Sequence, residues 1–291
     1  MEIIKTKNKL QELVGKLKNN GKTIGLVPTM GALHEGHLQL IRRCAKENDV
    51  CIVSIFVNPT QFNDKNDLAK YPRTLEADAK LLEKNNCFAI FAPEVDEVYS
   101  SEELNSTFEF NFNGLDEVME GKFRPGHFNG VVQIVGKLFE LTTPDKAYFG
   151  EKDFQQLAII RHLVATKSYP IEIIGCPIVR EESGLALSSR NALLCESEKQ
   201  IATNIYKTLL KSIDYQNEKS IKETIDWVIT TINNIGGLRV EYFEIVDAIK
   251  SVSEDTPPEL IGDIHSNGII LTGGGAFLNG LDKLITAQTG I

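Results

Sequence analysis

The feature that most constrains the fold is the run VCIVSIFV at residues 50–57, which is apolar throughout except for Ser54. A strand that is apolar on both faces must be covered on both sides, as strands are inside a parallel sheet. Parallel neighbours require crossover connections, which are usually helices. The run therefore predicts a layered α/β fold, with helices on both faces of a mostly parallel sheet.

The rest of the first 175 residues follows the pattern that such a sheet requires. Short apolar runs that predict strands alternate with longer segments whose apolar residues recur at helical spacing. The predicted strands are residues 23–30, 50–57, 87–93, 146–150 and 171–179, and the predicted helices are residues 34–48, 75–85, 131–144 and 153–168. This order predicts a Rossmann-like, doubly wound parallel sheet, in which ligands bind beyond the carboxyl ends of the strands.

The pattern changes near Cys176. Two amphipathic segments rich in Lys and Glu, residues 196–213 and 218–235, predict helices, and the alternating run at 238–248 predicts a strand. We therefore expect a larger domain at residues 1–175 and a smaller α+β domain at residues 176–291.

Charge and composition limit the classes of function. The formal net charge is −9 and Lys and Arg are not clustered, which disfavours nucleic acid as a partner. No apolar run reaches the roughly 18–20 residues that span a bilayer, and the N-terminus lacks the pattern of a secretory signal. The five cysteines are scattered without a CxxC pair, as in reduced cytosolic proteins. These features predict a cytoplasmic protein with small-molecule ligands.

The segment PTMGALHEGHL, residues 28–38, carries the strongest chemical pattern. It joins a predicted strand to a predicted helix and places His34 and His37 on one face of the first helical turn. Unpaired N–H groups and the positive end of the helix dipole make such a turn suited to phosphate. Imidazoles there could stabilise charge on a leaving pyrophosphate. An isolated HxxH pair would more often be a chance surface feature, but the complete strand–turn–helix context favours a nucleotide site.

Three further segments suggest ligand contacts only weakly when each is taken alone. FVNPTQFN places Asn58 and Gln61 at a strand end, where they could grip hydroxyl and carboxylate groups or simply form an Asx–Pro turn. FGEKDFQQL places Lys152 and Gln156 after a short strand. GLALSSRN offers two hydroxyls and Arg190, which suit a triphosphate or an ordinary helix cap. In YPRTLEADAKLL, Asp78 by itself would be a solvated helix residue.

The four segments PTMGALHEGHL, FVNPTQFN, FGEKDFQQL and GLALSSRN resemble, in this order and spacing, the pantothenate synthetase (pantoate–β-alanine ligase) family over about residues 1–248. The resemblance implies an HxGH nucleotidylyltransferase-type fold and a homodimer. It also implies an ATP-dependent reaction in which pantoate becomes pantoyl adenylate and β-alanine then displaces AMP, with pantoate and ATP bound by the first domain and Mg²⁺ as cofactor.

The resemblance also implies roles for individual residues. His37, His34 and Lys152 would be catalytic, Gln61, Gln156 and Asn58 would contact pantoate or β-alanine, and Asp78 would be associated with Mg²⁺. The implied ATP contacts are Met30, Gly31, Ala32, Leu33, His34, Glu35, Gly36, His37, Gly150, Glu151, Lys152, Asp153, Val179, Leu187, Ser188, Ser189 and Arg190.

The C-terminal segment departs from this family. Residues 254–291 are similar to the end of bacterial actin-like rod-shape proteins, in which an LTGGGA turn like that at Gly273–Gly275 helps to bind adenosine. The segment could be a fused fragment, a converged natural terminus or a second nucleotide site. Every implied site residue precedes Asn191, so we expect activity to survive if the small domain docks, and a chain ending at Ala248 tests this.

Two other functions compete with the ligase. Another HxGH-type nucleotidylyltransferase would leave a dinucleotide-like product rather than an amide, so product analysis separates the two. An actin-like scaffold is suggested by the tail alone and would sediment in the presence of ATP.

Overall fold

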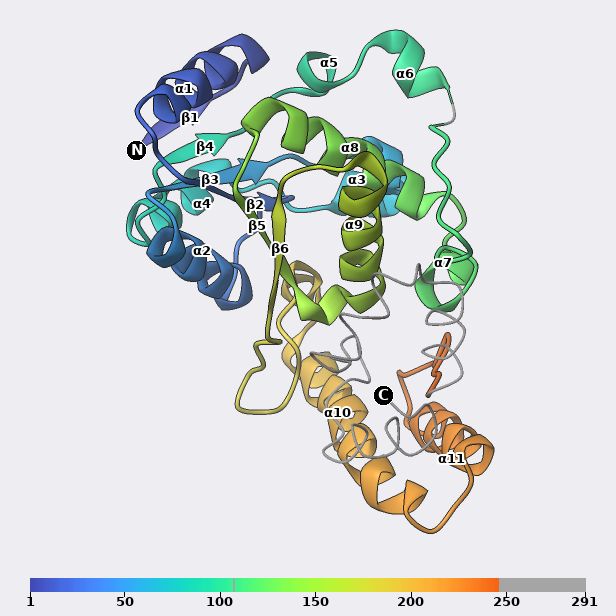
Figure 1. Ribbon diagram of the computed structural model, residues 1–291. Coiled ribbons are helices and arrows are strands. Elements are labelled where there is room, and N and C mark those ends of the chain that lie inside the picture. The colour runs from blue at the N-terminus through green and yellow to red at the C-terminus, as the bar shows by residue number, and fades with distance from the viewer. Residues whose placement is uncertain (107, 246–291) are drawn as a thin grey trace. The chain divides into compact units, whose positions relative to one another are not determined.

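The computed structural model describes residues 1–106 and 108–245. Its centre is a six-stranded sheet with the order β1-β4-β3-β2-β5-β6, in which every pairing is parallel (Figure 1). The strands are β1 (Glu2–Ile4), β2 (Ile24–Thr29), β3 (Val50–Ile55), β4 (Ala89–Phe91), β5 (Lys146–Gly150) and β6 (Glu172–Cys176). The predicted α/β fold with a doubly wound parallel sheet is confirmed.

The apolar run at residues 50–57 forms β3, an interior strand hydrogen-bonded to β2 and β4. Ile52 and Val53, whose side chains point to opposite faces, are both 0% exposed. The predictions for β2 to β6 are confirmed, but β1 was missed. At three residues, of which only Ile4 is buried, this strand is too short for its periodicity to show in the sequence.

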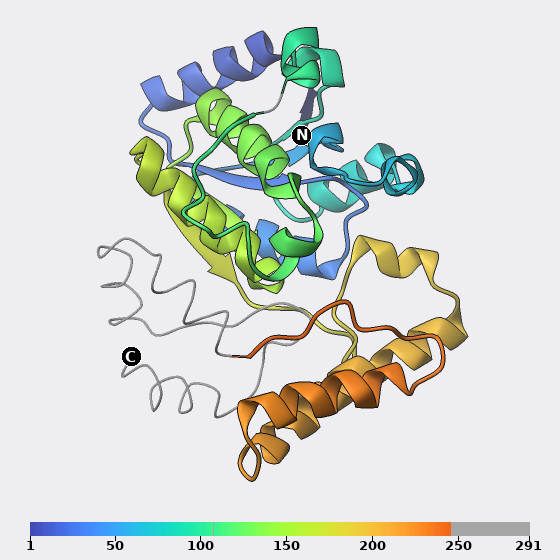
Figure 2. The ribbon, with the colours of Figure 1, turned by 90° about the vertical axis from the view of Figure 1, so that its right-hand side faces the viewer.

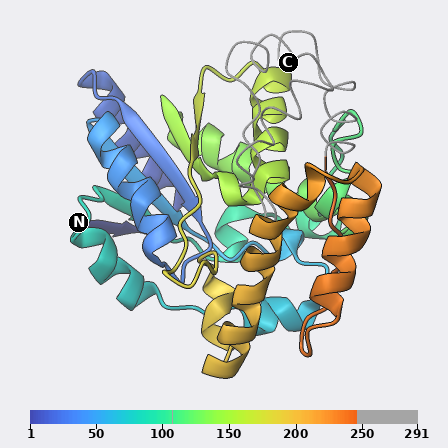
Figure 3. The ribbon, with the colours of Figure 1, turned by 90° about the horizontal axis from the view of Figure 1, so that it is seen from below.

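Helices cover both faces of the sheet. The helices α1 (Lys7–Asn19), α8 (His127–Thr142) and α9 (Phe154–Lys167) lie on one face, and α2 (Glu35–Glu47) and α4 (Leu75–Glu83) lie on the other (Figures 1 and 3). The shorter elements are η1 (Pro59–Gln61), α3 (Lys65–Lys70), α5 (Val95–Val98), α6 (Ser101–Asn105), α7 (Met119–Phe123), η2 (Glu151–Asp153) and η3 (Ser189–Leu193).

The strand order reverses at β2. The chain proceeds from β2 to β3 and β4 in one direction, and then returns to pair β5 with the other side of β2. Ligands of such sheets bind outside the carboxyl ends of the strands at this reversal. The segments that leave the carboxyl ends of β2 and β5 begin at Met30 and Glu151, and both contain residues predicted from the sequence.

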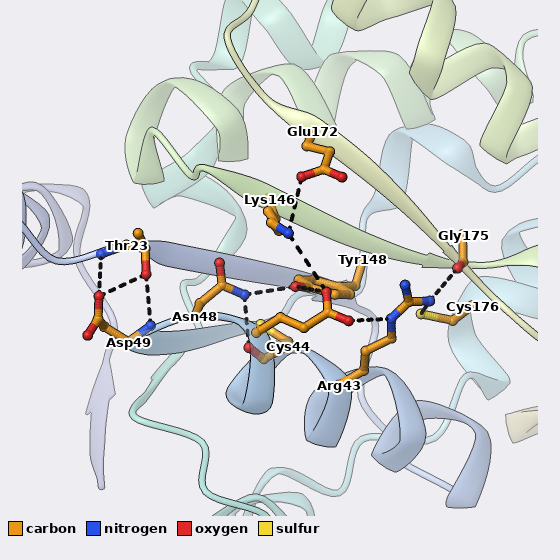
Figure 4. Close-up of polar contacts among 11 residues, drawn as sticks. Thr23, Arg43, Cys44, Asn48, Asp49, Lys146, Tyr148, Glu172, Gly175 and Cys176 are labelled. Atoms are coloured by element: carbon orange, nitrogen blue, oxygen red, sulfur yellow. Dashed lines mark hydrogen bonds and ion pairs between the residues drawn. The ribbon is translucent and has the colours of Figure 1, made fainter. Parts of the chain in front are cut away.

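The C-terminal half of α2 is bound tightly to the sheet (Figure 4). Arg43 donates from Nε to Glu47 at 2.8 Å and from a terminal nitrogen to the carbonyl of Gly175 at 2.9 Å. Tyr148 of β5 donates to the second Glu47 oxygen at 2.9 Å. The Arg43 hydrogen bond lowers the pKa of Glu47, and burial raises the pKa of Tyr148. These contacts attach α2 to both β5 and β6.

By its internal contacts the chain divides into two compact units. The first comprises residues 1–111, 124–150 and 156–177, and the second comprises residues 112–123, 151–155 and 178–291. The sequence had predicted contiguous domains at 1–175 and 176–291, whereas residues 112–123 and 151–155 belong to the second unit. In none of the helices among the described residues is there a segment long and apolar enough to span a bilayer.

The second unit contains the antiparallel helices α10 (Glu196–Gln216) and α11 (Ile221–Asn233), which lie side by side (Figure 2). A strand was predicted at 238–248, but residues 238–245 form no strand. Instead Leu238, Val240 and Phe243 pack against the core of the helix pair, so their apolar faces are covered without a strand partner. The atypical segment 254–291 lies outside the described residues.

We predict that Asp49 stabilises the amino end of β2 in a pH-dependent way. Its Oδ2 accepts hydrogen bonds from the backbone N and the hydroxyl of Thr23, both at 2.9 Å, and these lower the pKa of Asp49 to about 2 (Figure 4). Because this pKa lies below the unfolded value, the stabilisation is complete above about pH 4 and declines as the pH falls toward 2. Urea midpoints of wild type and Asp49→Asn should differ at pH 6, and the difference should shrink below pH 4 and become smallest near pH 2. A constant difference would contradict this account.

Candidate active site

The turn between β2 and α2 is built from consecutive residues in left-handed conformations. Gly31 has φ +81° and Ala32 has φ +50°, a region that residues with side chains rarely adopt. The carboxylate of Asp78, on α4, accepts hydrogen bonds from Ala32 N at 2.9 Å and from Leu33 N at 2.8 Å. This turn directs the chain from the carboxyl end of β2 into α2.

His34 and His37 lie together at the start of α2. Their ring centroids are 4.0 Å apart and the rings are tilted by 34°. The backbone N–H of His34 donates to Nδ1 of His37 at 3.4 Å. A neutral His37 ring that accepts at Nδ1 carries its proton on Nε2, which makes Nε2 a hydrogen-bond donor. The sequence prediction that these rings share one face is confirmed.

The first turn of α2 also offers backbone donors. In any α-helix the first N–H groups lack an acceptor within the helix, and in α2 these include Glu35 and Gly36. The N–H groups of Ala32 and Leu33 already donate to Asp78. The Glu35 carboxylate forms an ion pair with Arg42, two turns further along the helix. The positive end of α2 is therefore a possible anion site with its donors at Glu35 and Gly36.

Asn58, which was predicted to contact a substrate, is only 1% exposed and is surrounded by protein partners. Its Nδ2 donates to Gly130 O and to Gln61 Oε1, both at 3.0 Å, and its Oδ1 accepts from the Tyr99 hydroxyl at 2.8 Å. Burial raises the pKa of Tyr99 to about 12, so this hydroxyl remains a donor at neutral pH. The geometry fits a residue that orients Gln61 rather than one that meets a ligand.

Gln61 ends the short helix η1 and is held from three directions. Besides Asn58, it donates from Nε2 to the Met30 sulfur at 3.3 Å, and its carbonyl lies 2.7 Å from Nδ1 of His127. These contacts bring Gln61 beside the turn that follows β2. The structure thus joins two sequence segments, 28–38 and 56–63, that were predicted to act together.

Residues after β5 fall in both units. Gly150 ends β5 and Gln156 lies in α9, and both belong to the first unit. Glu151, Lys152 and Asp153 belong to the second unit, where Lys152 Nζ lies 3.5 Å from Asp153 Oδ1. A Lys–Asp pair at this distance and exposure is weak, so the ammonium can exchange partners easily.

The predicted ATP contacts between Val179 and Arg190 form a hairpin in the second unit. Leu187 N donates to Val179 O at 3.0 Å, and Ser188 Oγ accepts from Arg190 N at 3.3 Å. The Arg180 guanidinium lies over the Tyr206 ring, with 4.2 Å to its centroid, and burial lowers the pKa of Arg180. The hairpin therefore holds Val179 and residues 187–190 together.

Comparison with known proteins identifies the family of the chain. The family model described as Pantoate-beta-alanine ligase matches residues 2–268. A pantothenate synthetase of Phocaeicola vulgatus is 58% identical over 248 residues, which are 85% of this chain and 87% of the relative. One of Porphyromonas gingivalis is 53% identical over 247 residues, again 85% of this chain and 87% of the relative.

The chain belongs to the pantoate–beta-alanine ligase family.

Solved structures agree with this assignment. The pantothenate synthetase of Thermus thermophilus superposes with a TM-score of 0.78 at 38% identity, covering 87% of this chain and 89% of that one. A pantoate–beta-alanine ligase of Francisella tularensis, described as complexed with beta-gamma ATP and beta-alanine, gives a TM-score of 0.73 at 38% identity, covering 81% and 86% of the two chains. This member of the family is an ATP-dependent ligase, and its Rossmann-like first unit has the nucleotidylyltransferase-type fold.

Sequence reasoning missed several residues that support the ligase site. Gln155 is 5% exposed and donates to the carbonyls of Leu115 and Val118 at 2.6 and 2.7 Å, which ties the start of α9 to residues 112–123. His127 and Thr74 were also missed. Their partners, the Gln61 carbonyl and the Asp78 carboxylate, are not apparent from spacing in the sequence. Only the RPGH motif preceding α8 could have drawn attention to His127.

The described residues of this ligase contain no group of three or more His, Cys, Asp or Glu side chains that could hold a metal ion. Asp78, which the resemblance had associated with Mg²⁺, is 2% exposed and faces backbone N–H groups. The residues present therefore do not fit a protein-bound magnesium site at Asp78.

We predict that Gly130→Ala weakens substrate binding by displacing Gln61. A Cβ at Gly130 would overlap the Thr60 carbonyl and lie 2.6 Å from Gln61 N, so η1 would have to move. Gly136, also in α8, has only the Tyr169 hydroxyl near its Cβ position, at 4.0 Å. We expect at least about a tenfold rise in the KM of the substrate that Gln61 is predicted to contact, equivalent to about 1.4 kcal/mol.

The matched control is Gly136→Ala. It should leave every KM unchanged and stabilise the helix by about 0.5–1 kcal/mol. Steady-state kinetics and thermal unfolding of both variants measure these effects. Equal KM values for Gly130→Ala and wild type would contradict the proposed dependence on η1.

Proposed function

We propose that this chain condenses (R)-pantoate with β-alanine to form pantothenate, with ATP converted to AMP and pyrophosphate. The observation that carries the proposal is the turn between β2 and α2, which places His34, His37 and a helix N-terminus at the strand reversal of the sheet. Membership in the pantoate–beta-alanine ligase family supports the choice of substrates.

The reaction requires activation of a carboxylate, because oxide is too poor a leaving group for direct amide formation. An oxygen of the pantoate carboxylate attacks the α-phosphorus of ATP, and the bond from that phosphorus to pyrophosphate breaks. The amine of β-alanine then attacks the acyl carbon, AMP leaves, and the ammonium proton passes to solvent. The protein's part in both steps is alignment and stabilisation of phosphate charge.

The start of α2 is suited to the developing charge on pyrophosphate. The Glu35 and Gly36 N–H groups and Nε2 of His37 are the donors that we assign to phosphate oxygens, since the Ala32 and Leu33 N–H groups are directed to Asp78. His34 packs against His37 and supports its orientation. Met30 and Gly31 would lie against the nucleotide because the turn brings them beside it, and they would not donate hydrogen bonds to it from their backbone N–H groups.

The remaining assignments follow the family motifs. Gln61 and Gln156 would bind pantoate, with Gln61 shared by β-alanine and oriented by Asn58. Lys152 would neutralise the α-phosphate. The other proposed ATP contacts are Gly150, Glu151, Asp153, Val179, Leu187, Ser188, Ser189 and Arg190.

We further propose that Mg²⁺ enters as MgATP, bound through the phosphates and water, as is common for this ion. The enzyme would act in the cytoplasm as a homodimer. The cysteines are consistent with a reducing compartment, since all five lie in described residues and none forms a disulfide. We also propose a two-domain organisation, residues 1–175 and 176–291, in which residues 112–123 and 151–155 pack with the second domain.

Product analysis tests the proposal. Purified protein incubated with (R)-pantoate, β-alanine and MgATP should yield pantothenate, AMP and pyrophosphate in equal amounts. A dinucleotide-like product, or AMP release that does not depend on pantoate, would contradict it.

We predict that His37→Ala and Lys152→Ala each lose about a hundredfold or more of the adenylation rate while remaining folded, because each removes one donor to the transition-state charge. Pantoate-dependent exchange of pyrophosphate into ATP is the measurement. His37→Gln retains an amide N–H and should lose less than His37→Ala. The control is Lys16→Ala, since the Lys16 side chain is exposed and forms an ion pair with Glu12 on α1. Near-wild-type exchange in either alanine variant would remove that residue from its proposed role.

A further inference from the structure

The carboxylate of Asp78 is among the few buried acidic groups in the described residues. It is 2% exposed and lies in the first turn of α4. A buried carboxylate is strongly unfavourable unless donors surround it. Its Oδ1 accepts from Leu33 N at 2.8 Å, and its Oδ2 accepts from Ala32 N at 2.9 Å and from the Thr74 hydroxyl at 3.0 Å. Two of these three donors are consecutive backbone groups of the turn that precedes α2.

That turn needs an external partner to hold its shape. Gly31 and Ala32 are both in the left-handed region, at φ +81° and +50°. Glycine adopts this region freely, but a residue with a side chain, such as Ala32, persists in it only where surrounding contacts maintain it. The turn lies close to both α4 and β3, because a Cβ at Gly31 would lie 3.1 Å from Asp78 Oδ2 and 3.0 Å from Ile55 Cγ2. A side chain at position 31 would therefore crowd both the carboxylate and Ile55 of β3.

We propose that Asp78 is a positioning residue, which clamps the turn at Gly31–Leu33 so that His34, His37 and the first N–H groups of α2 face the phosphates. The proposal rests on the function proposed above and adds a residue that acts through the turn without touching substrate. It replaces the role of magnesium ligand, which the buried, backbone-directed carboxylate does not fit.

The hydrogen bonds from the Ala32 and Leu33 N–H groups to Asp78, which we call the clamp, also determine which backbone N–H donors remain for a ligand. Because Ala32 and Leu33 direct their N–H groups toward α4, the donors available to an anion are displaced toward Glu35 and Gly36. If Asp78 were lost, the Ala32 and Leu33 N–H groups would lack their acceptor and the turn could relax. His34 follows the clamped residues directly, so the histidine pair would lose its alignment.

Hydrogen exchange tests the clamp without any ligand. In protein kept in EDTA, the amides of Ala32 and Leu33 should exchange slowly in wild type. They should exchange at least about tenfold faster in Asp78→Asn, whose side-chain amide cannot accept both hydrogen bonds. The matched control is Asp49→Asn, which removes a similar carboxylate–backbone contact at the other end of β2 and should leave these amides unchanged. Unchanged exchange in Asp78→Asn would overturn the proposal, whether or not the chain makes pantothenate.

Kinetics then separates positioning from metal binding. In pantoate-dependent pyrophosphate exchange, Asp78→Asn should lower kcat at least about tenfold, whereas the Mg²⁺ concentration for half-maximal rate should stay within about twofold of wild type. A rise of about tenfold or more in that Mg²⁺ concentration, with kcat restored at high Mg²⁺, would identify Asp78 as a metal ligand and overturn the proposal.

If Asp78→Asn does not fold, Thr74 provides a milder change. Thr74→Ala removes the hydroxyl that orients Oδ2 together with the γ-methyl, whereas Thr74→Ser removes the methyl and retains the hydroxyl. We expect faster exchange at Ala32 and a lower kcat in Thr74→Ala, with both restored in Thr74→Ser. Equal behaviour of Thr74→Ala and wild type would count against the clamp.

Discussion

The candidate site depends on the fixation of α2 at both of its ends. At its start, the Asp78 carboxylate holds the two backbone N–H groups that precede the helix. At its end, Arg43 and Glu47 bind the helix to β5 and β6. Beside it, Gly25 of β2 brings the strand so close that a Cβ would lie 2.5 Å from Asn48 Nδ2. A helix dipole can favour an anion only where its N-terminus is held in place, and these contacts hold it at the carboxyl end of β2.

The proposed site suits adenylation because its donors at the start of α2 and at Gln61 are neutral, and its cations, Lys152 and Arg190, would offset phosphate charge. In the proposed site, backbone N–H groups, an imidazole and amide side chains would bind phosphate and hydroxyl oxygens without adding negative charge. The buried Asn58 is neutral as well. It donates to the Gln61 side-chain oxygen and so orients the Gln61 amide, whose nitrogen lies beside the Met30 sulfur. Preorganised donors of this kind need little rearrangement when charge moves to pyrophosphate.

The sequence was sufficient to predict most of the sheet and its ligand-binding edge. The strands β2 to β5 were visible because interior parallel strands must be apolar on both faces, and β6, at the edge of the sheet, was visible as a short apolar run. The PTMGALHEGHL turn was visible because it joins β2 to an amphipathic helix. Contacts between distant segments were not visible. The role of Asp78 depends on residues 45 and 46 positions away, and that of Gln155 on residues up to 40 positions away. Apolar and polar residues alternate at 238–245 as in a strand, but the apolar side chains pack against the helices α10 and α11 instead.

A crystal structure with a non-hydrolysable ATP analogue tests the central claim most directly. The account predicts that phosphate oxygens lie within hydrogen-bonding distance, about 2.7–3.2 Å, of the Glu35 or Gly36 N–H groups and of His37 Nε2. It also predicts that the Asp78 carboxylate remains bound to the turn. Phosphates that bind away from the start of α2, or a nucleotide whose metal ion displaces the Asp78 contacts, would contradict it.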